Sequence, residues 1–191
     1  MASFIVDEIR KLPNVKLGFF YCKHGVESRN TFVGVARGII SQILRQNEVI
    51  LPFLYEHACT SGEDVLSSDD LAAEILREVL HNCETTYIVL DGLDECEREG
   101  RRRIASIFQD LCESLPVRDL YRCRCIFISQ DDSAARKDFA KIPAFKITPS
   151  ETSRDIKTYS AAWSRKIRHK FDLSDEREQH ISNLITEAAA G

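Results

Sequence analysis

The sequence predicts an α/β fold in which helices cover both faces of a mainly parallel sheet, a three-layer arrangement. Three short stretches, residues 15–22, 85–90 and 123–129, have the length and apolar character of buried strands. Amphipathic segments separate these stretches, and such alternation is typical of strands joined by crossover helices. We therefore expect residues 85–90 to form the middle strand, with the other two on either side of it.

Helices are expected before and between the strands. An apolar stripe predicts a helix over residues 2–11. Ser28 can cap a helix over residues 28–47, in which Gly34 and Gly38 indicate a closely packed surface. The remaining expected elements are helices over residues 52–59, 71–80, 101–115, 154–170 and from 174 onward, and a last short strand over residues 145–148.

Three consecutive arginines, Arg101, Arg102 and Arg103, begin the helix expected over residues 101–115. Positive charge at a helix N-terminus is unfavourable by a few tenths of a kcal/mol or more. We therefore interpret these arginines as a solvated helix face, in preference to a phosphate site or a contact with a partner.

The composition limits the class of protein. With 191 residues, 43% hydrophobic and 29% charged, the chain has the composition of one globular domain, with a core over about 1–149 and a helical part over about 150–191. A net charge of −4 gives no electrostatic reason to expect a nucleic-acid partner. No apolar run approaches the roughly 20 residues that a membrane-spanning helix needs, so no membrane partner is expected.

Seven cysteines without a Cys-x-x-Cys pair indicate reduced core thiols, and hence a cytoplasmic location. Cys123 and Cys125 share one face of an expected strand and have no further ligand nearby, which favours core packing over structural zinc. Cys22 and His24 are interpreted as the end of a strand and not as a nucleophile with its base.

The stretch over residues 85–96 combines the middle strand with an acidic cluster. Its apolar run stops at Asp91, Gly92 allows a sharp turn, and Asp94 and Glu95 follow. Ligands of open α/β sheets bind at the carboxyl ends of the strands. Mg²⁺ takes oxygen ligands and is usually held by one or two carboxylates together with nucleotide phosphates. The stretch therefore predicts a magnesium and nucleotide site, and the alternative is an acidic turn after a core strand.

Four apolar residues followed by Asp-Gly-Leu-Asp-Glu-Cys resemble the Walker B motif of the NACHT-type NTPases of the STAND class, particularly the fungal and nephrocystin-3-like proteins. The resemblance implies a P-loop NTPase-like fold and, for the full-length family, Mg²⁺ with ATP or GTP as cofactor. It also implies that Asp91 holds Mg²⁺ through water, and that Asp94 and Glu95 are the catalytic acids that position or activate the water attacking the γ-phosphate. Protein partners and self-association through the NACHT fold are expected on the same grounds.

The residues after the stretch 123–129 match the family's sensor 1 position, which reads the γ-phosphate and is often an arginine after a serine. Here Ser129 is followed by Gln130. A glutamine can donate a hydrogen bond but carries no charge, so this position departs from the family pattern.

The sequence has no phosphate-binding loop of the form Gly-x-x-x-x-Gly-Lys-Ser/Thr, because none of its 8 glycines is followed by lysine. The resemblance places that loop and the strand before it upstream of Met1. We therefore expect a NACHT-like domain truncated upstream of or within Walker A, whose sheet lacks the first strand. The chain by itself is expected to bind no nucleotide and to need no cofactor.

Two classes of function stay open. The first is part of a signalling NTPase that uses nucleotide to switch an oligomeric protein, of the kind used in fungal innate immunity or heterokaryon incompatibility. The second is a nucleotide-free interaction or scaffold domain that keeps the fold without the chemistry.

Overall fold

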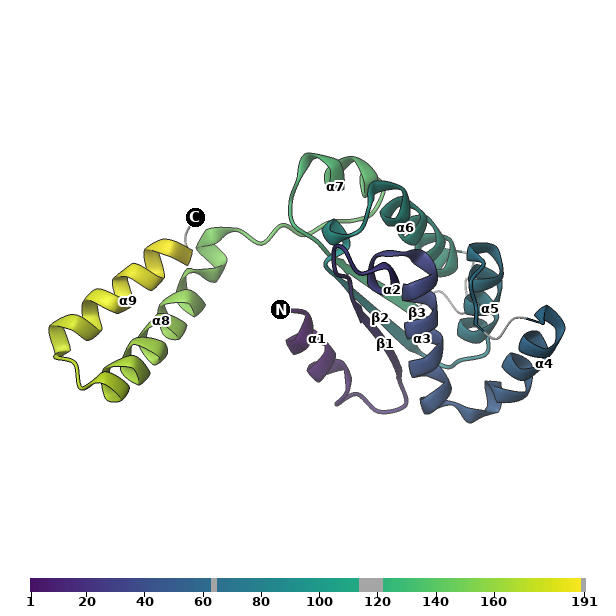
Figure 1. Ribbon diagram of the computed structural model, residues 1–191, viewed down its shortest axis with the longest axis horizontal. Coiled ribbons are helices and arrows are strands. Elements are labelled where there is room, and N and C mark those ends of the chain that lie inside the picture. Colours follow the sequence, from purple (N-terminus) through teal and green to yellow (C-terminus); the bar gives the residue numbers. More distant parts are fainter. Residues whose placement is uncertain (63–64, 114–121, 190–191) are drawn as a thin grey trace. The chain divides into compact units, whose positions relative to one another are not determined.

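The computed structural model describes residues 1–62, 65–113 and 122–189. The chain divides into two compact units, Met1–Ile142 and Pro143–Gly191. The first unit contains the sheet, and the second contains two long helices (Figure 1).

The described residues of the first unit form a three-stranded sheet of β1 (Lys16–Tyr21), β2 (Thr86–Asp91) and β3 (Cys123–Ile128). Both strand pairs are parallel and the order is β1-β2-β3. The prediction that residues 85–90 form the middle strand is therefore confirmed. The last residue of β2, Asp91, lies in register with Tyr21 of β1 and Ile128 of β3.

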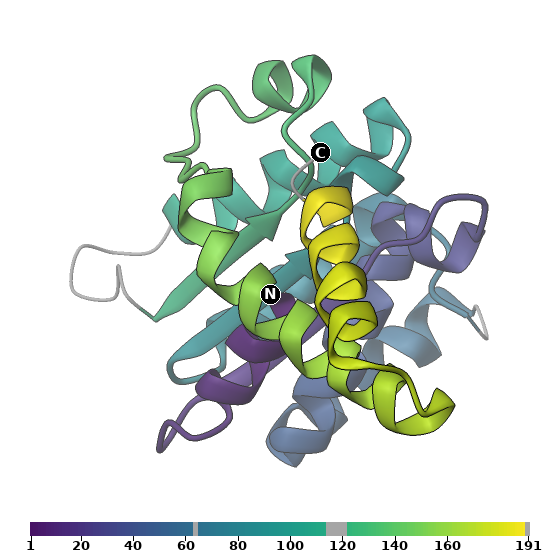
Figure 2. The same cartoon turned by 90° about the vertical axis from the view of Figure 1, so that its left-hand side faces the viewer.

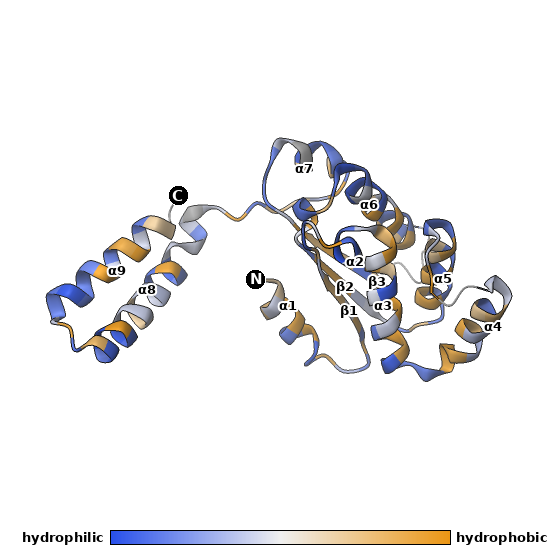
Figure 3. Cartoon of the chain, in the orientation of Figure 1, coloured by the Kyte–Doolittle hydropathy of each residue, from blue (hydrophilic) through white to orange (hydrophobic). Residues whose placement is uncertain are grey.

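Helices cover both faces of this sheet, which confirms the predicted α/β class (Figure 1). The larger hydrophobic core includes Ile88 and Leu90 of β2, and the smaller core includes Val89 together with Leu17 of β1. This alternation follows from the two-residue period of a strand. The strands are mostly hydrophobic along their length (Figure 3). The helices of the larger core are α3 (Phe32–Gln46), α5 (Asp69–His81) and α6 (Arg98–Glu113), and α1 (Ala2–Ile9) covers the other face.

β1 forms one edge of the sheet, and two side chains of α3 occupy its outward hydrogen-bonding groups. Gln46 donates to the carbonyl of Leu17 (2.7 Å) and accepts from its N–H (2.9 Å). Gln42 makes the same pair with Phe19 (2.8 and 3.1 Å). Four helical residues rise about 6 Å and two strand residues about 6.6 Å, so the two repeats match. An edge filled in this way is protected from pairing with another strand.

The helix expected over residues 28–47 is interrupted. A short helix α2 (Glu27–Asn30) ends before Thr31, whose extended backbone and side chain cap α3 by accepting from the Gly34 N–H (3.2 Å). The expected Ser28 cap is therefore wrong. The expected close packing is confirmed, because a Cβ at Gly34 would lie 2.3 Å from the Ser28 carbonyl oxygen and one at Gly38 would lie 2.6 Å from the Phe20 ring.

The expectation that the three arginines form a solvated face is wrong for Arg101, whereas Arg102 and Arg103 are partly exposed but pair with acids of other elements. Arg101 is buried and donates to the Asp138 carboxylate, as does Arg102. Arg103 pairs with Asp69 and Asp70 at the start of α5. Asp138 ends a short helix, α7 (Ser133–Asp138), that the sequence did not predict. Internal acidic partners, located far away in the sequence, thus neutralise the charge at the start of α6.

The strand expected over residues 145–148 does not form, since residues 143–148 belong to neither a helix nor a strand. An extended segment gains backbone hydrogen bonds only beside a neighbouring strand, and among the described residues the sheet ends at β3. Phe145 in this segment is 81% exposed.

The remaining described helices belong to both units. A single 3₁₀ turn (Glu48–Ile50) leads into α4 (Leu51–Ser61) in the first unit. In the second unit, α8 (Pro149–Phe171) and α9 (Asp175–Ala189) lie side by side and antiparallel (Figures 1 and 2). Arg168 of α8 pairs with Glu178 of α9 (3.0 Å). Among the described residues, no helix combines the length and hydrophobicity needed to cross a membrane.

Candidate functional site

Asp91 ends the middle strand at the carboxyl edge of the sheet, where the three loops that follow the strands meet. The Cys22 N–H donates to the Asp91 carbonyl (2.8 Å), and the Gly92 N–H donates to the Ile128 carbonyl (2.9 Å). These bonds extend the parallel ladders one step beyond the strands. The Asp91 side chain is partly exposed and, by strand alternation, lies on the α1 face of the sheet.

Gly92 makes the turn after β2 with a φ of 76°, a conformation that residues with a Cβ adopt at a cost. A 3₁₀ turn over Leu93–Glu95 follows, closed by a bond from the Glu95 N–H to the Gly92 carbonyl (2.9 Å). Leu93 is fully buried and anchors this turn on the larger core. The anchor leaves Asp94 and Glu95 directed away from the core.

Each acid of the turn accepts a main-chain hydrogen bond from a neighbouring loop. Asp94 Oδ1 accepts from the Gln130 N–H (3.0 Å), after β3. Glu95 Oε2 accepts from the His24 N–H (3.2 Å), after β1. The acidic turn therefore links the loops that follow all three strands. Sequence reasoning missed His24 as a neighbour of Glu95, although both follow adjacent strands and could have been paired on that basis.

The two residues predicted to sense nucleotide lie in the loop after β3. Ser129 is partly buried, and its hydroxyl donates to the Gln130 carbonyl (3.2 Å). Gln130 is exposed and contacts Asp94 through its main chain. The structure thus brings Gln130 and Asp94 together, whereas Glu95 bonds to the loop on the opposite side of the turn.

The sequence of the chain matches a known protein family. A family model described as the N-terminal region of nephrocystin 3 matches residues 1–130. The chain belongs to this family. Vegetative incompatibility protein HET-E-1 of Podospora anserina is 27% identical over 123 residues, which are 60% of this chain and 9% of that protein. These matches confirm the predicted resemblance to NACHT-like, nephrocystin-3-type domains, and the chain spans only a small part of that relative.

Cys22 does not have the properties of a thiolate nucleophile. A hydrogen bond with Cys96, burial and the nearby Asp91 charge all raise the pKa of Cys22. A thiolate nucleophile requires the opposite shift. The interpretation of Cys22 as the end of a strand agrees with this environment.

Within residues 1–62, 65–113 and 122–189, no three His, Cys, Asp or Glu side chains are grouped as a protein-only metal site requires. Cys123 and Cys125 therefore form no such site in the described chain. Mg²⁺ needs fewer protein ligands, since one or two carboxylates suffice when phosphates and water supply the other ligands. Asp91, partly exposed at the end of β2, fits that smaller role.

Proposed function

We propose that this domain supplies the Walker B side of a nucleotide site in a NACHT-type switch protein. The observation that carries the proposal is the position of Asp91, which ends the middle parallel strand beside the loops that follow both neighbouring strands. Ligands of open α/β sheets bind at this edge. The match to the nephrocystin-3 N-terminal family supports the same reading.

Each residue has a role in this proposal. Asp91 would hold Mg²⁺ through water, and the metal would neutralise phosphate charge when nucleotide is bound. Asp94 and Glu95 would orient the attacking water, and their bonds to the Gln130 and His24 main chains hold the two carboxylates in place. Ser129 and Gln130 would lie near the γ-phosphate.

The chain by itself should not hold nucleotide. Most ground-state binding in this class comes from loop amides, a lysine and a helix N-terminus acting on the phosphates. The sequence contains no Gly-Lys pair that could provide that loop. Titration of a fluorescent ATP or GTP analogue with Mg²⁺ should therefore give no saturable signal with the 191-residue chain. Saturable binding that is lost in Asp91→Ala would contradict this expectation.

The metal side of the proposal can be tested without nucleotide. Without phosphates the carboxylates hold the metal only weakly, but paramagnetic broadening also detects weak binding. Mn²⁺, a paramagnetic substitute for Mg²⁺, should therefore broaden the amide resonances of Asp91 to Glu95 in NMR spectra when it is added in excess. The Asp91→Asn variant should lose this broadening. The Asp131→Asn variant removes one acid from the neighbouring loop and should keep it.

A nucleotide-free scaffold is the second candidate, and one observation favours it. Asp94 and Glu95 already accept hydrogen bonds from the protein, so the acidic turn has a structural use that needs no ligand. Broadening that is absent, or equal in the wild type and Asp91→Asn, would support the scaffold over the Walker B proposal.

A further inference from the structure

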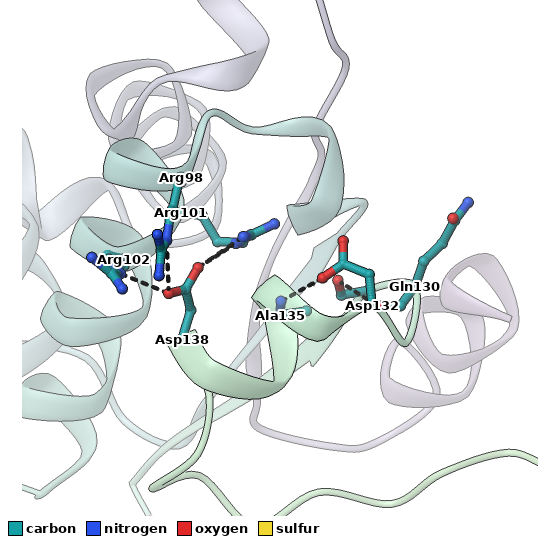
Figure 4. A network of polar contacts seen from close by, with 8 residues as sticks. Arg98, Arg101, Arg102, Gln130, Asp132, Ala135 and Asp138 are labelled. Atoms are coloured by element: carbon teal, nitrogen blue, oxygen red, sulfur yellow. Dashed lines mark hydrogen bonds and ion pairs between the residues drawn. The ribbon is translucent and has the colours of Figure 1, made fainter.

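Asp138, at the end of α7, is surrounded by three arginines from the first two turns of α6 (Figure 4). Arg101 donates to Oδ2 from two nitrogens (3.0 and 2.8 Å), and Arg102 donates to Oδ1 (2.6 Å). The Arg98 guanidinium lies 3.6 Å from Oδ1. The carboxylate is completely covered, while Arg98 and Arg102 are each about half exposed. We call these four residues the Asp138 cluster.

α7 depends on contacts of this kind. It has 6 residues, and an isolated helix of that length does not persist in water. Among the described residues, further support comes from the buried Ala135 and from the stacking of the following Phe139 on Phe127 of β3, with ring centroids 5.8 Å apart. The Asp138 cluster supplies the charged connection between α7 and α6.

The start of α7 is connected directly to the candidate site. Asp132 caps the helix by accepting from the Ala135 N–H (Figure 4). The Asp132 N–H donates to the Gln130 carbonyl (3.0 Å), and the Gln130 N–H donates to Asp94. A chain of hydrogen bonds and one short helix therefore joins Asp138 to the acidic turn.

We propose that Asp138 is a positioning residue, which holds the loop Ser129–Asp132 against Asp94 by fixing α7 on α6. The importance of Asp138 for nucleotide chemistry rests on the proposed function, but its effect on the position of the loop does not. The nearby Asp131 and Arg136 pair differs in kind. Both members are exposed and lie in α7 or the loop before it, so this pair cannot attach the helix to α6.

The test compares Asp138→Asn with Asp131→Asn by hydrogen exchange and NMR in the whole chain, without metal or nucleotide. Loss of a charge-assisted contact should release the loop, so exchange of the Gln130 amide should become about tenfold faster. Exchange of the amides in the middle of β2 should become faster only to the extent that the global stability falls. Asp131→Asn should leave the Gln130 amide unchanged.

A spectroscopic signature separates positioning from general destabilisation. In the wild type, the Gln130 amide proton shift should respond when Asp94 is replaced by alanine, because the two residues are hydrogen-bonded. That response should be lost in Asp138→Asn and partly restored in Asp138→Glu. Arg102→Ala, which removes a half-exposed partner and leaves Arg101 in place, should give an intermediate result and serves if Asp138→Asn does not fold.

Two results would overturn the proposal. One is an unchanged Gln130 response in folded Asp138→Asn. The other is faster exchange that is equal at Gln130 and throughout β2. Because Mn²⁺ broadening at Asp91 tests the proposed function separately, either idea can fail while the other stands.

Discussion

Gly92 determines how the chain leaves the middle strand. Its positive φ turns the backbone so that Leu93 enters the core and the next two acids face outward. A Cβ added here would lie 3.3 Å from the Cys22 carbonyl oxygen, at the close contact between the loops after β1 and β2. One residue thus sets the conformation on which the orientation of Asp94 and Glu95 depends.

Replacing Gly92 with alanine should lower the free energy of unfolding by about 1–2 kcal/mol, because an L-residue pays for the left-handed conformation. Urea unfolding followed by circular dichroism measures this loss. Gly25→Ala is a matched control, since Gly25 has a φ of 71° and no atom within 4 Å of the added Cβ. Gly92→Ala should cost more than the control, and equal losses would show that the Cys22 contact is unimportant.

Asp91 and the arginines of α6 differ in how much of their surroundings the sequence predicts. The position of Asp91 at the end of a buried strand was predictable, because a run of apolar residues followed by an acid marks the strand end. The partners of Arg101 and Arg102 were not, since Asp138 lies 37 and 36 residues away in a helix without a sequence pattern. The sequence gives the charge of a side chain but does not say which distant residue will pair with it.

At the scale of elements, periodicity predicted the long helices and all three strands of the sheet. It gave no signal for α7, which is shorter than two helical turns. It placed a strand over residues 145–148, where the alternating pattern is present but no neighbouring strand of the described chain provides hydrogen bonds. A local sequence pattern therefore predicts a strand only where a neighbouring strand provides partners for its backbone N–H and C=O groups.

Gln42 and Gln46 illustrate the same limit on α3. In the sequence they are polar residues on an amphipathic helix, and the structure shows them filling the free edge of β1. Gln42 is partly buried and Gln46 is exposed, and the hydrogen bonds that they donate to the strand are partly buried. Their spacing of four residues matches two residues of a strand. This spacing predicts the edge contacts only if the helix is already known to lie along the strand.

Replacing both glutamines with alanine should lower the free energy of unfolding by about 2 kcal/mol, since the four hydrogen bonds to β1 and one within α3 are lost and water replaces some of them. The exposed edge of β1 should also promote self-association. Urea unfolding and light scattering after size-exclusion chromatography measure the two effects. Gln109→Ala is the control, because Gln109 donates only to Glu113 of its own helix among its described contacts. Unchanged stability and mass in the double variant would contradict the edge-protecting role.

At the scale of the whole molecule, the family match and the structure divide the chain at different places. The match ends at residue 130, whereas the first compact unit continues to Ile142 and includes α7. The Asp138 cluster consequently joins matched residues of α6 to an unmatched helix. The fold class was predictable because many apolar positions repeat the same pattern, but this connection depends on single residues and was not.

The Asp138 cluster should also make the stability of the molecule depend on acidic pH. Burial acts to raise the pKa of Asp138, but the hydrogen bonds and charges of Arg102 and Arg101 outweigh it and hold the pKa below its ordinary value of 3.8. A carboxyl whose pKa is lowered in the native state binds protons more readily when unfolded. Its stabilising contribution is therefore complete above the unfolded value and is lost as the pH falls through the native value.

The free energy of unfolding should accordingly exceed that of Asp138→Asn by a constant amount, about 2 kcal/mol, from neutral pH down to about pH 5. Below pH 3.8 the difference should shrink as the carboxylate of the wild type is protonated. Urea unfolding of both proteins at a series of pH values measures this difference. Other acids with lowered pKa, such as Glu151, are present in both proteins and cancel in the comparison. A difference that stays constant down to pH 3 would mean that the contribution of Asp138 does not depend on its charge, and that the arginines hold α7 through packing alone.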